Sequence, residues 1–223
     1  MNMNLLLIII TITIPTIAHL YVSYNFKKYK KTIVKSEVSG FECARKIMDE
    51  HDMNDVYITA ISGKYSDHYN SSRKVIKLSK QVFNDSSITS ISIASFESKK
   101  ALLDKSNDSA FKFKDSLNNL FKYASYLGYL FILIGLFLAV QLFFSLGIVL
   151  EILNLLFHLI TIKVDFKIAR GALDELLEQS IISSEENEMV KSVLSACAYK
   201  NLAFLIDNVI EVGIMIYDFG SSK

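Results

Sequence analysis

The stretch YASYLGYLFILIGLFLAVQLFFSLGIVLEILNLLFHLIT, residues 123–161, decides the fold class of this chain. Its only Asp, Glu, Lys or Arg is Glu151, and it is much longer than the roughly 20 helical residues that cross a bilayer once. Two membrane helices joined by a short turn near Gln141 to Gly147 account for this length. The stretch therefore predicts a transmembrane hairpin over residues 121–162.

A second apolar run, from Leu5 to Tyr24, is also long enough to cross a bilayer and predicts a first transmembrane helix over residues 1–25. No positive charge precedes it and no small-residue cleavage site is evident, which favours an anchor over a signal peptide. Positive charges mark the cytoplasmic side, so we expect the N-terminus outside the cell and the following segment inside. The charges that follow the run are Lys27, Lys28, Lys30, Lys31 and Lys35.

Residues 26–120 are polar enough to form a small α+β lobe on the cytoplasmic side. Apolar periodicity and capping residues predict a helix over Ser39 to Glu50 and another over residues 86–104. Runs of β-branched residues bounded by Asp, Asn and Ser predict strands over Val56 to Ile61 and Lys74 to Leu78. Residues 163–197 are charged and helical in pattern. The predicted fold is an α-helical multi-pass membrane protein with a small α+β cytoplasmic domain.

A fourth apolar segment, residues 198–218, is predicted either to span the membrane or to lie in its interface as an amphipathic helix. It and the hairpin each carry polar side chains along one helical face. Because charges inside a span face protein or water, we favour two stripes that hydrogen-bond to each other. An ion or proton path, or a dock for a partner's helix, stays open. The stripes are Glu151, Asn154 and His158 in the hairpin, and Lys200, Asp207, Asn208 and Glu211 in the fourth segment.

Composition narrows the possible functions. The chain is 51% hydrophobic with a formal net charge of +1, which excludes the basic signature of a nucleic-acid-binding protein. Its two cysteines, Cys43 and Cys197, lie too far apart in sequence for a zinc ribbon and are expected to be buried, inert thiols. No histidine pairs with another histidine or cysteine at the i, i+4 spacing of a helical metal site.

Three blocks of sequence carry a resemblance to a known family. They are SGFECARKIMDEHDMNDVYI (residues 39–58), the turn Asp67-His68-Tyr69 followed by the strand from Lys74 to Ser79, and the motifs FHLIT, VDF and ARGAL within residues 157–173. Together they resemble the YugP-type membrane zinc metallopeptidases, which are similar in architecture to the HtpX-like peptidases. The resemblance implies a metallopeptidase-like scaffold in a bacterial cytoplasmic membrane.

Peptidases of this type carry His-Glu-x-x-His, in which two imidazoles bind zinc and the Glu acts as general base. The resemblance places the two histidines on Phe96 and Lys100, the general base on Glu97, a motif glycine on Lys99 and the third ligand, a Glu, on Asp165. Two of three ligands are thus replaced and the third is one methylene shorter. The resemblance therefore implies that this chain binds no zinc and has no catalytic residue.

Loss of the metal alone would leave two carboxylates close together in a partly buried cleft, where like charges repel. We expect the Lys100 ammonium to occupy the space of the metal and to pair with Asp165 or Glu97. The alternative is that Glu97 and Lys100 are ordinary solvated residues on a helix surface.

These observations predict a catalytically inactive homologue without a cofactor that serves as a binding, regulatory or assembly subunit in the membrane. Its expected partners are the lipid bilayer and another membrane protein or a second copy, and not a nucleic acid. Two alternatives stay open: an active zinc peptidase with a rearranged site, and a purely structural subunit of a membrane complex. A free strand edge is expected to bind extended peptides. That strand is Lys74, Val75, Ile76, Lys77 and Leu78.

Overall fold

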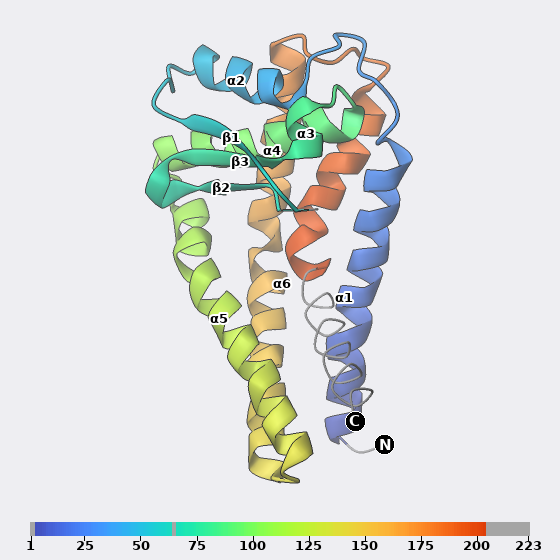
Figure 1. The fold of residues 1–223 in the computed structure, drawn as a ribbon, viewed down its shortest axis with the longest axis vertical. Coiled ribbons are helices and arrows are strands. Elements are labelled where there is room, and N and C mark those ends of the chain that lie inside the picture. Colours follow the sequence, from blue (N-terminus) through green and yellow to red (C-terminus); the bar gives the residue numbers. More distant parts are fainter. Residues whose placement is uncertain (1–2, 64–65, 204–223) are drawn as a thin grey trace. The chain divides into compact units, whose positions relative to one another are not determined.

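The structure is a computed structural model that describes residues 3–63 and 66–203, and the side chains of residues 13–63 and 66–203. The described part is mostly helical (Figure 1). Its elements are α1 (Met3–Lys28), α2 (Gly40–Glu50), β1 (Tyr57–Ile61), β2 (His68–Asn70), the 3-10 turn η1 (Ser71–Arg73), β3 (Val75–Ser79), α3 (Lys80–Asn84), α4 (Ile88–Lys105), α5 (Ser109–Phe137) and α6 (Gln141–Glu178), followed by helical residues 187–203.

The described residues form two compact units. The first comprises residues 3–21, 113–162 and 199–203, and the second comprises residues 22–112 and 163–198. Residues 187–203 form one continuous helix, so no break marks the predicted start of the fourth apolar segment at residue 198. Most of that predicted segment, including Asp207, Asn208 and Glu211, lies outside the described residues.

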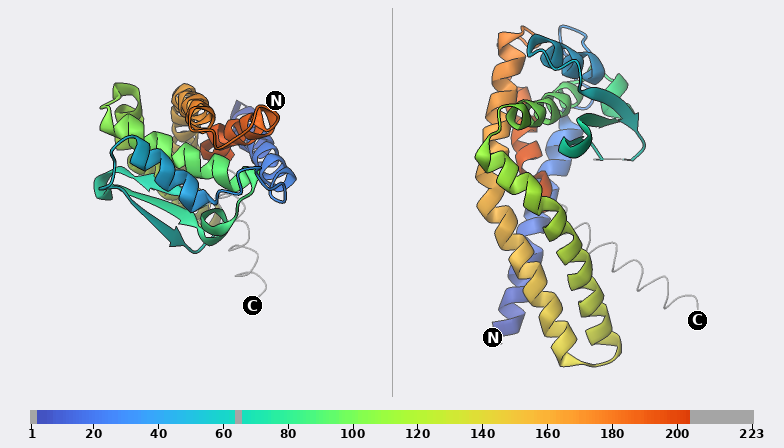
Figure 2. Two further views of the ribbon diagram at one scale, coloured as in Figure 1. Left: turned by 90° about the horizontal axis from the view of Figure 1, so that it is seen from above. Right: turned by 90° about the vertical axis from the view of Figure 1, so that its left-hand side faces the viewer.

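In the first unit, α5 and α6 form an antiparallel hairpin joined by residues 138–140 (Figure 2). The turn predicted near Gln141 to Gly147 is wrong by a few residues, because Gln141 already begins α6. Ala139 adopts a left-handed φ of 53°, and the amide of Val140 donates to the Gly135 carbonyl at 3.1 Å. This arrangement ends α5 without the glycine that marks most such turns.

The two hairpin helices approach each other closely through glycines. A Cβ atom added at Gly147 would lie 2.6 Å from the carbonyl oxygen of Gly128, and one at Gly135 would lie 2.4 Å from the Phe144 nitrogen. Small residues at such crossings are typical of helices packed in a membrane. The rings of Phe121 and Phe157 stack with their centroids 4.1 Å apart. Both helices are long and apolar enough to cross a membrane.

The second unit contains a three-stranded sheet in the order β1-β3-β2. β1 runs parallel to β3, with Tyr57 opposite Val75, and β2 runs antiparallel, with His68 opposite Lys77. Two predictions were therefore wrong. The strand expected to offer a free edge, residues 74–78, is the central one and is paired on both sides. His68 and Tyr69, predicted as a turn, belong to β2.

Helices α2 and α4 pack against this sheet, and α4 lies between the sheet and the part of α6 after Ile162 (Figure 2). The predicted helix over residues 39–50 is confirmed: Ser39 is the N-cap of α2 and forms a capping box with Glu42. The largest fully buried apolar side chains of the unit are Ile47, Met48, Ile76, Leu78, Ile88, Ile91, Ile168, Leu176, Ile181, Leu194 and Val34.

Helix α4 is the most completely buried helix of the second unit, since packing covers it along most of its circumference. Two of its buried serines satisfy their hydroxyls on the helix itself: Ser92 Oγ donates to the Ile88 carbonyl at 2.6 Å, and Ser95 Oγ to the Ser92 carbonyl at 3.0 Å. A charged side chain on this helix therefore needs a specific partner to remain charged.

Candidate functional site

Three of the positions that the family resemblance assigns to a metal centre, Phe96, Glu97 and Lys100, lie close together on α4. Glu97 is 1% exposed, and its Oε2 atom accepts a hydrogen bond from Lys100 Nζ at 2.7 Å. The same oxygen accepts a hydrogen bond from the backbone N–H of Tyr69 in β2 at 2.8 Å. The carboxylate thus joins α4 to the sheet, and one of its oxygens already has two donors.

The Lys100 ammonium lies beside residues that the family resemblance assigns to a metal centre. Its Nζ atom is 4.9 Å from the centroid of the Phe96 ring, within the range of a cation–π contact. Burial tends to lower the pKa of Lys100, but the charge and hydrogen bond of Glu97, together with the charge of Asp165, raise that pKa above its ordinary value. Lys100 is therefore a cation at neutral pH.

Asp165, which the sequence analysis predicts at the position of the third ligand, is 2% exposed and lies on the part of α6 that belongs to the second unit. The charge of Asp165 acts on Lys100 together with that of Glu97, so the structure places these three side chains near one another. We call these three residues with Phe96 the Lys100 cluster.

The donor set of the Lys100 cluster does not fit zinc. A Zn(II) site takes about three protein ligands with lone pairs, usually imidazole, thiolate or carboxylate. Phe96 has no lone pair, and the ammonium of Lys100 has none while it is protonated. Across residues 3–63 and 66–203, no group of three His, Cys, Asp or Glu side chains is placed to hold a metal ion. The two carboxylates alone make an incomplete site.

A second cluster, which we call the Glu175 cluster, surrounds the neighbouring lysine of α4. Lys99 Nζ lies 2.8 Å from Glu175 Oε1, and His51 Nε2 lies 2.8 Å from Glu175 Oε2. A Cβ at Gly171, one turn before Glu175 on α6, would lie 2.4 Å from Lys99 Cε. Gly171 thus leaves room for the lysine stem to reach its carboxylate. The cluster joins α2, α4 and α6.

Burial tends to raise the pKa of Glu175, but the hydrogen bonds from Lys99 and His51 outweigh burial and lower the pKa below its ordinary value. The sequence analysis did not predict Glu175 as the partner of Lys99 and His51. One signal was available, because two adjacent lysines on a buried helix require two carboxylates, and α6 carries acids at positions 165 and 175 on its packed side.

Residues 67–69, which the sequence analysis predicts to be a retained family turn, have structural contacts. Asp67 Oδ1 accepts a hydrogen bond from the Ser79 amide at 2.6 Å, which fixes the end of β3. Tyr69 donates its hydroxyl to Asp104 Oδ2 at 2.9 Å, so both its backbone and its side chain contact α4. His68 is exposed, with Nδ1 2.7 Å from the Ser66 carbonyl oxygen.

The polar stripe of α6 belongs to the first unit. Glu151 is 9% exposed and accepts a hydrogen bond from Ser125 Oγ of α5 at 3.1 Å, which makes the carboxylate part of the hairpin packing. Asn154 is buried on the same helix, and His158 is largely covered. Lys200 is the one residue of the predicted fourth-segment stripe that lies within the described residues.

The two thiols are buried in the second unit. Burial raises the pKa of Cys43 to about 12, and its Sγ lies 3.7 Å from the Ile91 carbonyl oxygen. Cys197 is 3% exposed, and neither cysteine is in a disulfide. The expectation that Cys43 is an inert thiol agrees with this environment.

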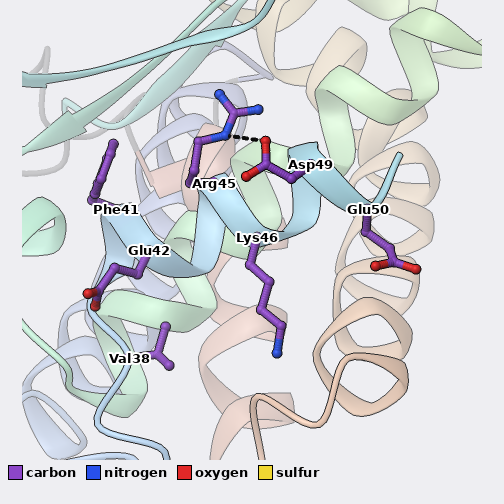
Figure 3. A pocket seen from close by; sticks show the side chains of 7 residues that line it. All are labelled: Val38, Phe41, Glu42, Arg45, Lys46, Asp49 and Glu50. Carbon is purple, nitrogen blue, oxygen red and sulfur yellow. Dashed lines mark ion pairs between the residues drawn. The ribbon is translucent and has the colours of Figure 1, made fainter. Parts of the chain in front are cut away.

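A hollow of about 600 Å³ lies on the outer face of α2 (Figure 3). Some of the charged side chains along it already have partners within the protein. Arg45 Nε lies 2.7 Å from Asp49 Oδ1, and Lys46 donates a hydrogen bond to the Gln179 carbonyl at 2.8 Å. Its lining shares no residue with either lysine cluster. The lining residues are Val38, Phe41, Glu42, Arg45, Lys46, Asp49 and Glu50.

Comparisons with known proteins bear on this geometry. A family model described as "Putative neutral zinc metallopeptidase" matches residues 4–219. The chain is also 32% identical over 195 residues to a Bacillus subtilis (strain 168) protein named "Putative membrane protease YugP", covering 87% of each chain. No solved structure matches. This chain belongs to the neutral zinc metallopeptidase family.

Proposed function

We propose that this protein is a catalytically inactive member of the neutral zinc metallopeptidase family and acts as a binding subunit in the membrane. The observation that carries the proposal is the position of the Lys100 ammonium, bonded to Glu97 at 2.7 Å where the family motif calls for a metal ligand. A charged lysine there supplies internally the positive charge that two neighbouring carboxylates require.

The environment of Glu97 also argues against a role as general base. A general base must be within hydrogen-bond reach of the water that it deprotonates, and in a zinc peptidase the metal lowers the pKa of that water. Glu97 instead holds Lys100 and the Tyr69 amide in a buried setting. In both contacts the carboxylate serves as a structural hydrogen-bond acceptor.

The proposed location is a membrane, because two helices are long and apolar enough to cross it and the matched relative is named a membrane protease. In this proposal α1 crosses as well, with the N-terminus outside and the second unit in the cytoplasm, as the lysines after α1 favour. The Ser125–Glu151 hydrogen bond supports helix packing, rather than an ion path, as the role of the α6 stripe.

Peptidase activity of the full-length protein in detergent tests the catalytic part of the proposal. We expect no cleavage of an unfolded substrate protein by the native chain, with or without added zinc. Zinc-dependent cleavage that a chelator stops and Glu97→Gln abolishes would overturn the proposal and restore the peptidase with a rearranged site.

Crosslinking in native membranes tests the binding part. We expect the native chain to capture a discrete membrane protein or a second copy of itself, and the Glu97→Gln variant to capture the same one, since no chemistry is involved. A chain that crosslinks to no discrete species would contradict a binding role.

A further inference from the structure

The first charged side chains of the whole chain form a compact group just after the apolar part of α1. Residues 1–26 contain no Lys, Arg, Asp or Glu, and residues 27–31 contain four lysines and no acid. We call residues 27–31 the basic segment; its lysines are Lys27, Lys28, Lys30 and Lys31. Because the whole chain has a net charge of only +1, this local excess of charge is not a general property of the protein.

The four ammonium groups of the basic segment are available to a ligand. All four side chains are exposed, and within the described part of the chain none forms an ion pair with a carboxylate. Lys35, four residues later, differs because it pairs with Glu185. Lys28 Nζ lies over the rings of Tyr24 and Tyr29, at 5.8 Å and 4.9 Å from their centroids.

The backbone around the basic segment is fixed against the start of α4. The Ile88 amide donates to the Thr32 carbonyl at 2.8 Å, and the Val34 amide donates to the Ser86 carbonyl at 2.9 Å. On the other side of the segment, Thr89 Oγ1 donates to the Phe26 carbonyl at 3.1 Å. The lysines therefore project from an ordered support, which lowers the entropy that binding must overcome.

Apolar and aromatic side chains flank the lysines. Tyr24 is 62% exposed and Ile33 is 58% exposed, one on each side of the basic segment. Tyrosine and lysine together at the end of an apolar helix are typical of the headgroup level of a bilayer, where the ring is partly buried and the ammonium meets phosphate.

We propose that the basic segment binds the phosphate headgroups of anionic phospholipids. Clustered lysines immediately after a membrane helix are attracted to anionic lipid, by about a fivefold change in affinity for each lysine near the surface. The exposed Ile33 and Tyr24 favour a lipid surface over a soluble polyanion such as RNA. The inference rests on α1 crossing the membrane and is independent of whether the protein cleaves peptides.

Binding of fluorescent phosphatidylglycerol to the full-length protein in detergent, read by anisotropy, tests this proposal, with fluorescent phosphatidylcholine as the neutral lipid. The native chain is expected to prefer the anionic lipid, less so at high salt because salt screens exposed charges. Lys30→Gln with Lys31→Gln should weaken anionic-lipid binding about 25-fold. The matched control, with the exposed Lys80→Gln and Lys191→Gln, should bind the anionic lipid like the native chain. The charge-preserving variant, Lys30→Arg with Lys31→Arg, should also bind it like the native chain.

Equal binding of the two lipids by the native chain would overturn the proposal. So would an equal loss of binding in the two Lys→Gln pairs, which would mean that only total charge matters. A native chain that binds a single-stranded RNA more tightly than phosphatidylglycerol, with the Lys30 and Lys31 pair abolishing it, would assign the segment to nucleic acid instead.

Discussion

Two adjacent lysines of α4 enter two different buried clusters. Lys100 pairs with Glu97, whose other donor is the backbone amide of Tyr69, whereas Lys99 pairs with Glu175, whose other partner is the side chain of His51. The Lys100 cluster ties α4 to the sheet, and the Glu175 cluster ties α4 to α2 and α6. The two lysines thus make two separate ion-pair contacts from one central helix.

The difference lies in what remains when the lysine is removed. In the Lys100 cluster the ammonium pairs with Glu97, so its loss leaves a buried carboxylate whose remaining donor is the Tyr69 backbone amide. In the Glu175 cluster His51 remains as a partner, and its side chain is 39% exposed, which lets water approach. The two clusters should therefore tolerate substitution very differently.

Lys100→Met should have the largest effect. It should lower the free energy of unfolding by about 3–5 kcal/mol, because breaking a buried ion pair from one side leaves an uncompensated charge. Denaturant titration of the full-length protein in detergent, followed by circular dichroism, measures this. Glu97→Gln combined with Lys100→Met should recover part of the loss, since no Glu97 carboxylate is then left without its lysine. Unchanged stability of Lys100→Met would show that the two clusters do not differ in this way.

Lys99→Met should lower the free energy of unfolding by less than Lys100→Met does, about 1–3 kcal/mol by the same titration. The reason is that Glu175 keeps its hydrogen bond to His51. In the Lys99→Met background, His51→Gln should destabilise the protein more than it does in the native chain, because Glu175 then loses the second of its two side-chain partners. If Lys99→Met destabilised as much as Lys100→Met, the contrast between the clusters would be lost.

The Glu175 cluster should lose its contribution to stability in acid, and the Lys100 cluster should lose its contribution in alkali. The folded-state pKa of Glu175 is lowered from 4.5, so its contribution is full above that value and is lost as pH falls through the lower folded-state pKa. The folded-state pKa of Lys100 is raised from 10.5, so its contribution is full below that value and is lost as pH rises through the higher folded-state pKa.

The measurement is the stability difference between the native chain and each of Glu175→Gln and Lys100→Met across the pH range. The Glu175 difference should shrink only in acid below about pH 4.5, and the Lys100 difference only in alkali above about pH 10.5. A Glu175 difference that stays constant to pH 3 would contradict its assigned ion pairs.

Gly171→Ala should have the smallest effect on stability, and it tests whether Gly171 makes room for the Lys99 side chain. Alanine favours helix over glycine by about 1 kcal/mol, but its Cβ would lie 2.4 Å from Lys99 Cε and displace that side chain from Glu175. The substitution should therefore stabilise a Lys99→Ala background by about 1 kcal/mol and the native background by less. Equal effects in the two backgrounds would mean that Gly171 does not accommodate Lys99.

Local signals predicted the local parts of this structure. The Ser39–Glu42 capping box is visible in sequence and begins α2, and both predicted strands lie within one residue of β1 and β3. β2 was missed because only three residues pair, and its Tyr69 amide is satisfied by a side chain 28 residues away. The hairpin turn was misplaced because Ala139 carries no turn signal despite its left-handed backbone.

The candidate site was predictable where it depends on spacing along one helix. Glu97 and Lys100 are three residues apart, a spacing that places them side by side on α4. The partners from other elements were not predictable in this way. His51, Glu175 and the Tyr69 amide reach α4 through the packing of α2, α6 and β2, and no periodicity encodes that packing.

The zinc content of the purified protein shows whether the native chain holds the metal of its family. Elemental analysis of the full-length chain in detergent should find far less than one zinc per chain, whereas the variant with Phe96→His and Lys100→His should bind close to one, because it regains two imidazoles beside Glu97 and Asp165. A control with Lys80→His and Lys112→His, which adds two surface histidines, should stay as low as the native chain. One tightly held zinc per native chain would contradict the account.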